Sequence, residues 1–321
     1  PYVRPNFANW FVLDPLDANH LLTGAQQIFS TLNAPTVTSS TWTEVFNLGT
    51  NPVTNAIRTT STMHVYGDNV YVGFCGDCGS VAIDTGFANG IATNVGGTVP
   101  PKKNTSDGWH FAAANGLDSR FIAGIEMDED DPKTIYVTLA GYAGNMRPAG
   151  SFLDPNAAKI GTGTVFKSTD AGETFTDISG NIPRAQANTV LLYKSAAGEQ
   201  LIVGTDIGPF ICNDNKGTSW APLGNGLPNV PINVMRFKPK ATTDEPDTIF
   251  AATFGRGIWT YAIPKLIVDP PPPPVTPPVT PPVTPPVTAP TNGGGRFGGG
   301  SSGLGLLMGL LSLGALRRRR R

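Results

Sequence analysis

The sequence is poor in cysteine, histidine and charge. Of 321 residues, 3 are cysteines, 3 are histidines and only 15% are charged, and the net charge is −1. Three cysteines are too few for a disulfide scaffold, so a hydrophobic core must hold the fold together. With a net charge near zero, the sequence lacks the excess of basic residues that is typical of nucleic-acid-binding proteins. We therefore predict no nucleic-acid partner.

Helical periodicity is also missing, because no convincing apolar stripe with a 3.6-residue period occurs before residue 300. The chain instead contains 38 glycines and 30 prolines, which is typical of short strands joined by turns. The length suits one large all-β domain followed by a tail. The first residue is a proline, and we expect the chain to be the C-terminal part of a longer protein or a processed form.

A polar turn between two β-rich segments organises the sequence. Residues 168–175 read S-T-D-A-G-E-T-F. Ser168 and Asp170 can hydrogen-bond the backbone of a turn, and Gly172 tolerates a positive φ. Phe175 then returns an aromatic side chain to the strands. The pattern recurs 45 residues later, at Asn213, Asn215, Gly217 and Trp220.

Paired apolar segments precede these turns and predict β-hairpins. Five such pairs occur, at residues 10–24, 63–73, 125–138, 190–204 and 234–252. The 45-residue period matches a four-stranded blade, and such units bury their faces only against neighbours. The sequence therefore predicts a radial array of about four to five blades.

The pattern S-x-D-x-G-x-T-[FW] resembles the Asp box of BNR-repeat, sialidase-like β-propellers, and the likeness extends from about residue 10 to residue 261. The resemblance implies an all-β propeller of four-stranded antiparallel blades over residues 1–264. That broad family includes sialidases, xyloglucan-active glycoside hydrolases and sortilin-type receptors, so the fold does not decide the function. No Arg-Ile-Pro motif occurs, which argues against sialidase activity. Residues 252–259 resemble the closing strand of xyloglucanase-type propellers.

Strict alternation of strands A to D within a blade places the loops on two faces. The A–B loops and the polar C–D turns share one face, and the B–C and D–A loops share the other, which we call the loop face. We expect the polar turns to be structural and ligands to bind the loop face, where the loops are longer. The ligand-binding candidates are Asn94, Arg120, Tyr142, Arg147, Asp206 and Arg256.

Carboxylates on the loop face would also suit a glycoside hydrolase. Asp206 follows an apolar strand, and Asp77 and Asp118 are its candidate catalytic partners. Hydrolysis requires two carboxyl groups about 5–9.5 Å apart, whereas the structural alternative is that Asp206 caps its own turn. Arg256 either binds a carboxylate or sugar hydroxyls, or forms a salt bridge across the last blade.

Cys75 and Cys78 form a lone C-x-x-C motif, for which we expect a local disulfide, with free thiols and a metal or redox role as alternatives. A zinc site needs four ligands, and no second pair lies nearby. Cys212 is expected to be a buried free thiol. We predict no metal and no cofactor, and no Ser-His-Asp set can be assembled from the three widely spaced histidines, which are His20, His64 and His110.

The composition changes after residue 264. Residues 265–292 carry P-P-V-T four times and favour a semi-rigid polyproline II stalk. A glycine-rich strip (293–303), an apolar segment (304–316) and five arginines (317–321) follow. The apolar segment, for which we expect a short helix, has 13 residues, fewer than the about 20 of an ordinary spanning helix.

This order of features resembles the GlyGly-CTERM sorting tail of Gram-negative bacteria. The resemblance implies secretion or display at the cell surface, transient anchoring in the membrane, and processing by a rhomboid-type protease; a plain C-terminal anchor is the alternative. Two functions follow. The first is a surface-displayed propeller that binds a glycan or an extracellular protein on its loop face. The second is a glycoside hydrolase that uses loop-face carboxylates.

Overall fold

A computed structural model describes residues 10–50, 55, 57–76, 89–118, 120–140, 163–195, 198–227, 229–242 and 245–263. All of these belong to the first of two compact units, Pro1–Ile267, and the second unit is Val268–Arg321. The predicted stalk, glycine-rich strip, apolar helix and basic cluster lie outside the described residues. So do four predicted site residues, which are Asp77, Cys78, Tyr142 and Arg147.

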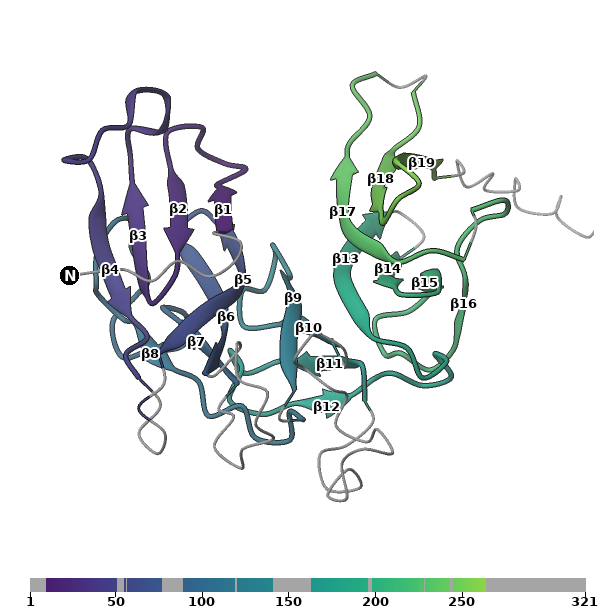
Figure 1. Cartoon of the computed structure of the whole chain (residues 1–321), viewed down its shortest axis with the longest axis horizontal. Coiled ribbons are helices and arrows are strands. Elements are labelled where there is room, and N and C mark those ends of the chain that lie inside the picture. Colours follow the sequence, from purple (N-terminus) through teal and green to yellow (C-terminus); the bar gives the residue numbers. More distant parts are fainter. Residues whose placement is uncertain are drawn as a thin grey trace, which may run out of the picture. The chain divides into compact units, whose positions relative to one another are not determined.

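The described residues form five antiparallel sheets and one 3-10 turn, η1 (Ala34–Thr36) (Figure 1). The first sheet contains β1 (Trp10–Leu13), β2 (Leu21–Gly24), β3 (Gln27–Thr31) and β4 (Thr43–Asn47). The second contains β5 (Arg58–Tyr66), β6 (Asn69–Gly76), β7 (Gly90–Thr93) and β8 (His110–Phe111). The third contains β9 (Phe121–Met127), β10 (Ile135–Ala140), β11 (Val165–Ser168) and β12 (Thr176–Asp177).

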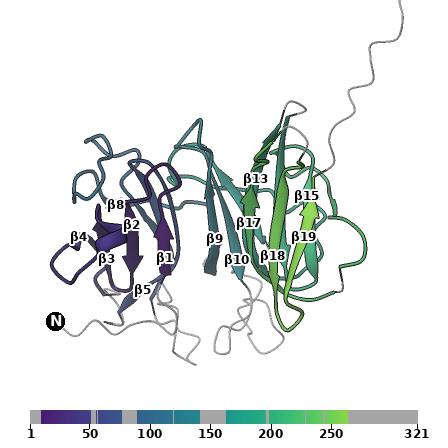
Figure 2. The same cartoon turned by 90° about the horizontal axis from the view of Figure 1, so that it is seen from above.

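The fourth sheet contains β13 (Ala187–Ser195), β14 (Gly198–Thr205), β15 (Gly208–Cys212) and β16 (Trp220–Pro222). The fifth contains only β17 (Ile232–Lys238), β18 (Thr248–Thr253) and β19 (Ile258–Ala262), which lie side by side in this order (Figure 2). Strands that are consecutive in the sequence pair within every sheet. The predicted all-β architecture of about four to five blades is therefore confirmed, and we call the sheets blades 1 to 5.

Apolar side chains between consecutive blades form the core. Four clusters of buried residues join the five blades in chain order, and each combines residues of two neighbouring sheets. In the cluster between blades 3 and 4, for example, Tyr136 and Val165 pack with Val190 and Trp220. The first strands of the blades are also in contact in the order β1, β5, β9, β13 and β17. Each blade thus buries its faces against its neighbours.

A glycine in the second strand permits this close approach in three blades. These glycines are Gly24, Gly73 and Gly204. A Cβ on Gly73 would lie 2.8 Å from Ile122 of β9, and one on Gly204 would lie 2.7 Å from Ile232 of β17. The absence of a side chain therefore sets how closely the first strand of the next blade packs.

No helix among the described residues has the length and apolar character that crossing a membrane requires.

Candidate functional site

The loop face of blade 3 carries a polar pocket of about 310 Å³. Its lining comes from the residues that lead into β11 and from the connection that follows β12. These are the B–C and D–A connections, so the pocket lies on the face where strand alternation predicts ligand binding. Its lining includes Gly163, Thr164, Asp177, Ser179, Gly180 and Arg184.

Two carboxylates meet at Gly163 on the edge of this pocket. The backbone N–H of Gly163 donates to Oδ2 of Asp118 at 3.2 Å, and a Cβ on Gly163 would lie 2.7 Å from Oδ2 of Asp177. Through the short Gly163 backbone, the two Oδ2 atoms are therefore at most about 8.4 Å apart. Burial raises the pKa of Asp118, and the charge of Asp177 raises it further. The charge of Arg120 and the hydrogen bond from the Gly163 N–H act in the opposite direction.

Two arginines accompany the carboxylates. Arg120 is 8% exposed and donates to the carbonyl of Gly163, so it positions the backbone between the two acids rather than presenting a charge to solvent. Arg184 is exposed and lines the pocket. On the Asp177 side, Oδ1 accepts from the N–H (2.8 Å) and the hydroxyl (2.5 Å) of Ser179, while Oδ2 faces Gly163. The pocket thus offers both carboxylate and guanidinium groups to a polar ligand.

The sequence-based candidates include Asp118 and Arg120, which lie next to the pocket, but not Asp177 and Arg184, which line it. Asp177 ends the short strand β12, and Arg184 lies seven residues further on, in the D–A connection. Their positions in the sequence could have identified them, because residues at the end of a fourth strand and in the D–A connection after it lie on the loop face.

Asp206 lies apart from this pair, in the turn between β14 and β15. Its carboxylate accepts hydrogen bonds from the side-chain amides of Gln186 (2.5 Å) and Asn188 (3.0 Å). Its backbone N–H donates to the carbonyl of Gln186 at 3.2 Å. These contacts tie the turn to β13 and its approach, so Asp206 has a structural role different from the expected capping of its own turn, which Thr205 performs by accepting from the N–H of Ile207 at 3.2 Å.

The structure corrects the placement of Asn94. This residue follows β7, which begins at Gly90, so Asn94 lies in the C–D connection and not in the B–C loop. It is buried, its Oδ1 accepts from the N–H of Val70 at 2.9 Å, and its Nδ2 donates to the carbonyl of Asp68 at 2.8 Å. Asn94 therefore holds the β5–β6 hairpin and does not reach the loop face.

Arg256 lies in the exposed turn between β18 and β19. Its carbonyl accepts from Nε1 of Trp259 at 3.0 Å. Its guanidinium forms no ion pair with any residue that the structure describes. The salt bridge that was one interpretation of Arg256 is therefore not found among these residues.

The polar turn after β11 is a closed hydrogen-bond network. The hydroxyl of Ser168 donates to Oδ1 of Asp170 at 2.7 Å and accepts from the N–H of Gly172 at 2.9 Å. Asp170 also accepts from the N–H (2.9 Å) and the hydroxyl (2.5 Å) of Thr174. Gly172 has φ +90°, and Phe175 is buried in the core. These residues stabilise the turn, which is the role expected of them.

The second polar turn differs from its predicted alignment by one residue. Asp214, not Asn215, accepts from the thiol of Cys212 (3.0 Å) and the hydroxyl of Thr218 (2.7 Å). Asn215 instead donates to Glu199 of β14, and Asn213 accepts from Gln200. Gly217 has φ +69°, and Trp220 is buried, as its alignment predicts. Ser219 is therefore an extra residue between the turn and the aromatic side chain.

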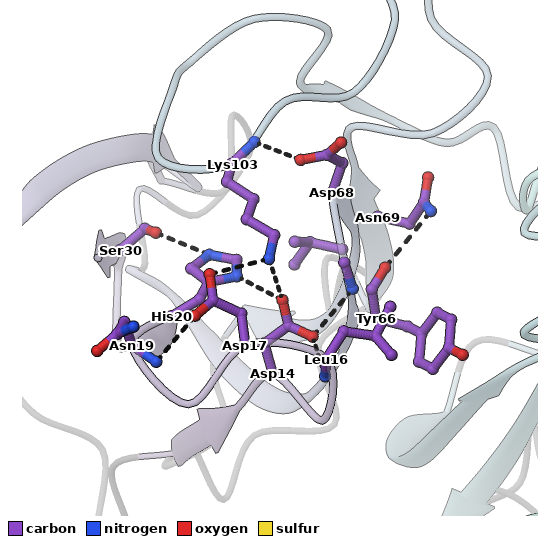
Figure 3. A network of polar contacts seen from close by, with 12 residues as sticks. Asp14, Leu16, Asp17, Asn19, His20, Ser30, Tyr66, Asp68, Asn69 and Lys103 are labelled. Carbon is purple, nitrogen blue, oxygen red and sulfur yellow. Dashed lines mark hydrogen bonds and ion pairs between the residues drawn. The ribbon is translucent and has the colours of Figure 1, made fainter. Parts of the chain in front are cut away.

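One Ser-His-Asp arrangement does exist, contrary to the sequence-based expectation (Figure 3). Nδ1 of His20 lies 3.0 Å from Oδ2 of Asp14, and Nε2 of His20 lies 3.1 Å from the hydroxyl of Ser30. Lys103 pairs with the same Asp14 oxygen at 2.8 Å, and the N–H of Gly67 donates to Asp14 Oδ1 at 3.0 Å. The set thus joins blade 1 to the first hairpin and the C–D connection of blade 2.

This arrangement is structural rather than catalytic. Ser30, His20 and Asp14 are each only 1% exposed. The cavity beside them has about 10 Å³, which is the room for about one water molecule and not for a substrate.

A half-buried pair of titratable groups joins the first strands of blades 2 and 3. Nδ1 of His64 lies 3.4 Å from Oε2 of Glu126, whose Oε1 accepts from the N–H of Leu192 in β13 at 3.2 Å. Burial lowers the pKa of His64 to about 4 and raises the pKa of Glu126 to about 8. Both shifts favour the neutral form of the side chain.

Cys75 is disulfide-bonded, and Cys212 is a buried free thiol, which confirms the expectation for Cys212. No group of three or more His, Cys, Asp or Glu side chains in the described part of the chain could hold a metal ion.

Comparison with protein-family models and with curated proteins finds no match. Among solved structures, a GH74 xyloglucanase from Xanthomonas campestris is similar, with 12% identity and a TM-score of 0.50 over 82% of this chain and 37% of that one. An ancestral GH74 enzyme has 13% identity and a TM-score of 0.44, over 81% and 32%. The major Malassezia sympodialis allergen Mala s 1 has 12% identity and a TM-score of 0.47, over 79% and 78%.

The chain thus spans about a third of the length of the GH74 proteins. At these identities the likeness establishes the fold alone, which is a β-propeller.

Proposed function

We propose that this propeller binds a glycan in the loop-face pocket of blade 3. The pocket around Asp177 and Arg184 is the observation that carries the proposal. Its volume of about 310 Å³ lies at the lower end of the range of small-molecule sites, which suits one or two sugar units. Carboxylate oxygens accept from sugar hydroxyls and guanidinium groups donate to them, so a neutral polyol matches this lining.

The solved structure with a TM-score of 0.50 is named as a xyloglucanase. We therefore choose xyloglucan as the first polysaccharide to test. The polar turns of blades 3 and 4 support the proposed Asp-box assignment. In each turn an aspartate carboxylate accepts a hydrogen bond from the hydroxyl of the threonine four residues later.

The experiment is a binding screen of the whole chain on a polysaccharide array, followed by titration calorimetry on any glycan that binds. We expect Arg184→Ala and Asp177→Asn to weaken binding about tenfold or more. The matched control is Asp107→Asn, which alters an exposed carboxylate in a C–D connection. A glycan that binds equally to all of these variants would remove the pocket from the role.

Glycoside hydrolysis is the second candidate, and the pairing of Asp118 with Asp177 favours it. Their Oδ2 atoms are at most about 8.4 Å apart, which is below the upper limit of the separations that glycosidases use. Asp118, whose pKa is raised, would protonate the glycosidic oxygen as general acid. Asp177 would act as the base that activates water or as the nucleophile.

Reducing-sugar release from the bound polysaccharide separates the two functions. At glycan concentrations that saturate each variant, loss of release by about 100-fold or more in both Asp118→Asn and Asp177→Asn assigns hydrolysis to the pair. Release that persists in both variants eliminates them as catalysts. Asp206→Asn serves as the comparison, and we expect it to retain activity because its carboxylate is held by two amides.

We further propose that the chain is exported and displayed at the surface of a Gram-negative cell through a GlyGly-CTERM-type tail. The order of glycine-rich strip, apolar segment and five arginines in residues 293–321 supports this. The test fuses the chain, with and without these residues, to a secretion signal, and follows surface labelling and the mass of the mature protein. Equal labelling and no processing would contradict the proposal.

A further inference from the structure

Ser179 connects the backbone on one side of the blade 3 pocket to the carboxylate of Asp177. Its hydroxyl oxygen accepts from two consecutive backbone N–H groups where the chain enters β11, that of Thr164 at 2.7 Å and that of Val165 at 3.0 Å. A hydroxyl group has two lone pairs and one proton. Both lone pairs of Ser179 are therefore occupied, and only its proton is left for a further hydrogen bond.

The proton of the Ser179 hydroxyl goes to Asp177. Oδ1 of Asp177 lies 2.5 Å from the hydroxyl oxygen, whereas the alternative acceptor, the carbonyl of Val165, lies 3.4 Å away. A hydrogen bond to an ionised carboxylate is also shorter and stronger than one to a neutral carbonyl. The N–H of Ser179 donates to the same Oδ1 at 2.8 Å. Two donors from one residue thus hold one oxygen of the carboxylate.

The second oxygen of Asp177 is left for a ligand. Asp177 is exposed and lines the pocket. A Cβ on Gly163 would lie 2.7 Å from Oδ2, so this oxygen has its room because residue 163 carries no side chain. In the part of the chain that the structure describes, no group donates to Oδ2. Oδ2 is therefore the acceptor that Asp177 offers to the pocket.

We propose that Ser179 is a positioning residue of this pocket, which fixes the Asp177 carboxylate so that Oδ2 accepts a hydrogen bond from one hydroxyl of a neutral sugar. This role rests on the proposed glycan site. A side chain that is already held in its binding orientation loses less conformational entropy when a ligand binds. Ser179 thus strengthens the hydrogen bond between Asp177 and the sugar without touching the sugar itself.

The hydroxyl of Ser179 also has a structural role, which must be separated from positioning. It accepts the N–H groups of Thr164 and Val165 just beyond the end of β12, where no further strand residue pairs with β11. Both of these residues are buried, so removal of the hydroxyl leaves two buried donors unpaired and should lower the stability of the fold. A loss of stability by itself therefore does not identify a positioning residue.

The first experiment needs no ligand and compares crystal structures of two variants of the whole chain. In Ser179→Ala we expect the Asp177 carboxylate to rotate and its Oδ2 to move by about 1 Å or more. In Ser179→Thr, which keeps the hydroxyl, Oδ2 should stay in place. A carboxylate that does not move in Ser179→Ala overturns the proposal and leaves the glycan site untouched. If Ser179→Ala does not fold, Ser179→Cys replaces it, because a thiol is a weak donor of similar size.

The second experiment measures binding by titration calorimetry with xyloglucan oligosaccharides, or with another glycan from the array if these do not bind. Ser179→Ala should weaken binding about fivefold or more, and Ser179→Thr by less than about twofold. In the Asp177→Ala background, Ser179→Ala should add less than about twofold, since a positioning residue acts only through its partner. The matched control is Thr174→Ala, which removes a hydroxyl donor from Asp170 in the C–D turn of the same blade and should bind normally.

The outcomes separate the positioning role from the glycan site. Effects of Ser179→Ala and Asp177→Ala that are independent of each other make Ser179 purely structural and overturn the proposal. Normal binding by Ser179→Ala together with weak binding by Asp177→Ala also overturns it, but keeps the glycan site. Normal binding by Asp177→Ala removes the glycan site itself, and the positioning role with it.

Discussion

The carboxylate of Asp14 couples blades 1 and 2, and replacing it with asparagine should destabilise the propeller. Its side chain is fully buried and contacts Lys103 (2.8 Å), His20 (3.0 Å) and the N–H groups of Leu16 (2.9 Å) and Gly67 (3.0 Å). Burial alone would raise the pKa of Asp14, but the hydrogen bonds from Lys103 and His20 outweigh it and lower the pKa from 3.8 to about 2.

The shift corresponds to about 2 kcal/mol of stability at neutral pH, because one pKa unit is about 1.4 kcal/mol. Since the pKa is depressed in the folded state, this contribution is complete above pH 3.8 and is lost as the pH falls through about 2. Asp14→Asn also leaves Lys103 without its buried partner, so we expect a loss of roughly 2–4 kcal/mol at pH 7.

The assay is urea unfolding followed by tryptophan fluorescence at pH 7, 5 and 3. The difference in unfolding free energy between the unaltered protein and Asp14→Asn should shrink as the pH falls from 5 to 3. Asp17→Asn is the matched control, because Asp17 pairs with the same lysine at 3.2 Å but is partly exposed, and its effect should be smaller. Equal effects of the two substitutions, or a difference independent of pH, would refute the reasoning.

Three further predictions concern stability. Burial raises the pKa of Glu126 to about 8 and lowers that of its neighbour His64 to about 4, so their contributions oppose each other below pH 6.5 and stability should fall as the pH rises from 6.5 to about 8. Glu126→Gln should remove this fall and raise the urea midpoint at pH 8. Asp214→Ala should lower the thermal midpoint more than Asn215→Ala, because Asp214 accepts the turn's hydrogen bonds. A larger effect of Asn215→Ala would instead support the sequence alignment, in which Asn215 corresponds to Asp170. Gly204→Ala should cost about 1–3 kcal/mol, since its Cβ would lie 2.7 Å from Ile232, and calorimetry would detect this.

Local patterns were sufficient for the blades because each strand is encoded within a few residues. Apolar pairs such as residues 190–204 became β13 and β14, and the recurring aromatic residues Phe175 and Trp220 mark the fourth strands. Strand alternation also placed the loop face correctly for Asp118 and Asp206. Asn94 was misplaced because strand ends are the least certain part of a pattern, and the start of β7 at Gly90 moved it to the opposite face.

Contacts between segments distant in the sequence could not be foreseen in the same way. Asp118 and Asp177 are 59 residues apart and belong to different blades. The backbone of Gly163 lies between them, and the bridge between Asn115 and Thr174 joins their two segments. Asp14, His20 and Ser30 lie close in the sequence, but their meeting depends on the pairing of β2 with β3, in which Leu22 opposes Ser30.

The amino-acid sequence by itself determined the repeat length, the strand content and the face on which loops gather, since these follow from local periodicity and turn chemistry. Tertiary structure alone decided which carboxylates approach each other and which Ser-His-Asp set is buried. The physical reason is that these properties depend on how closely neighbouring blades pack. The absence of a side chain at glycines such as Gly73 and Gly204 sets this distance, and no local pattern does.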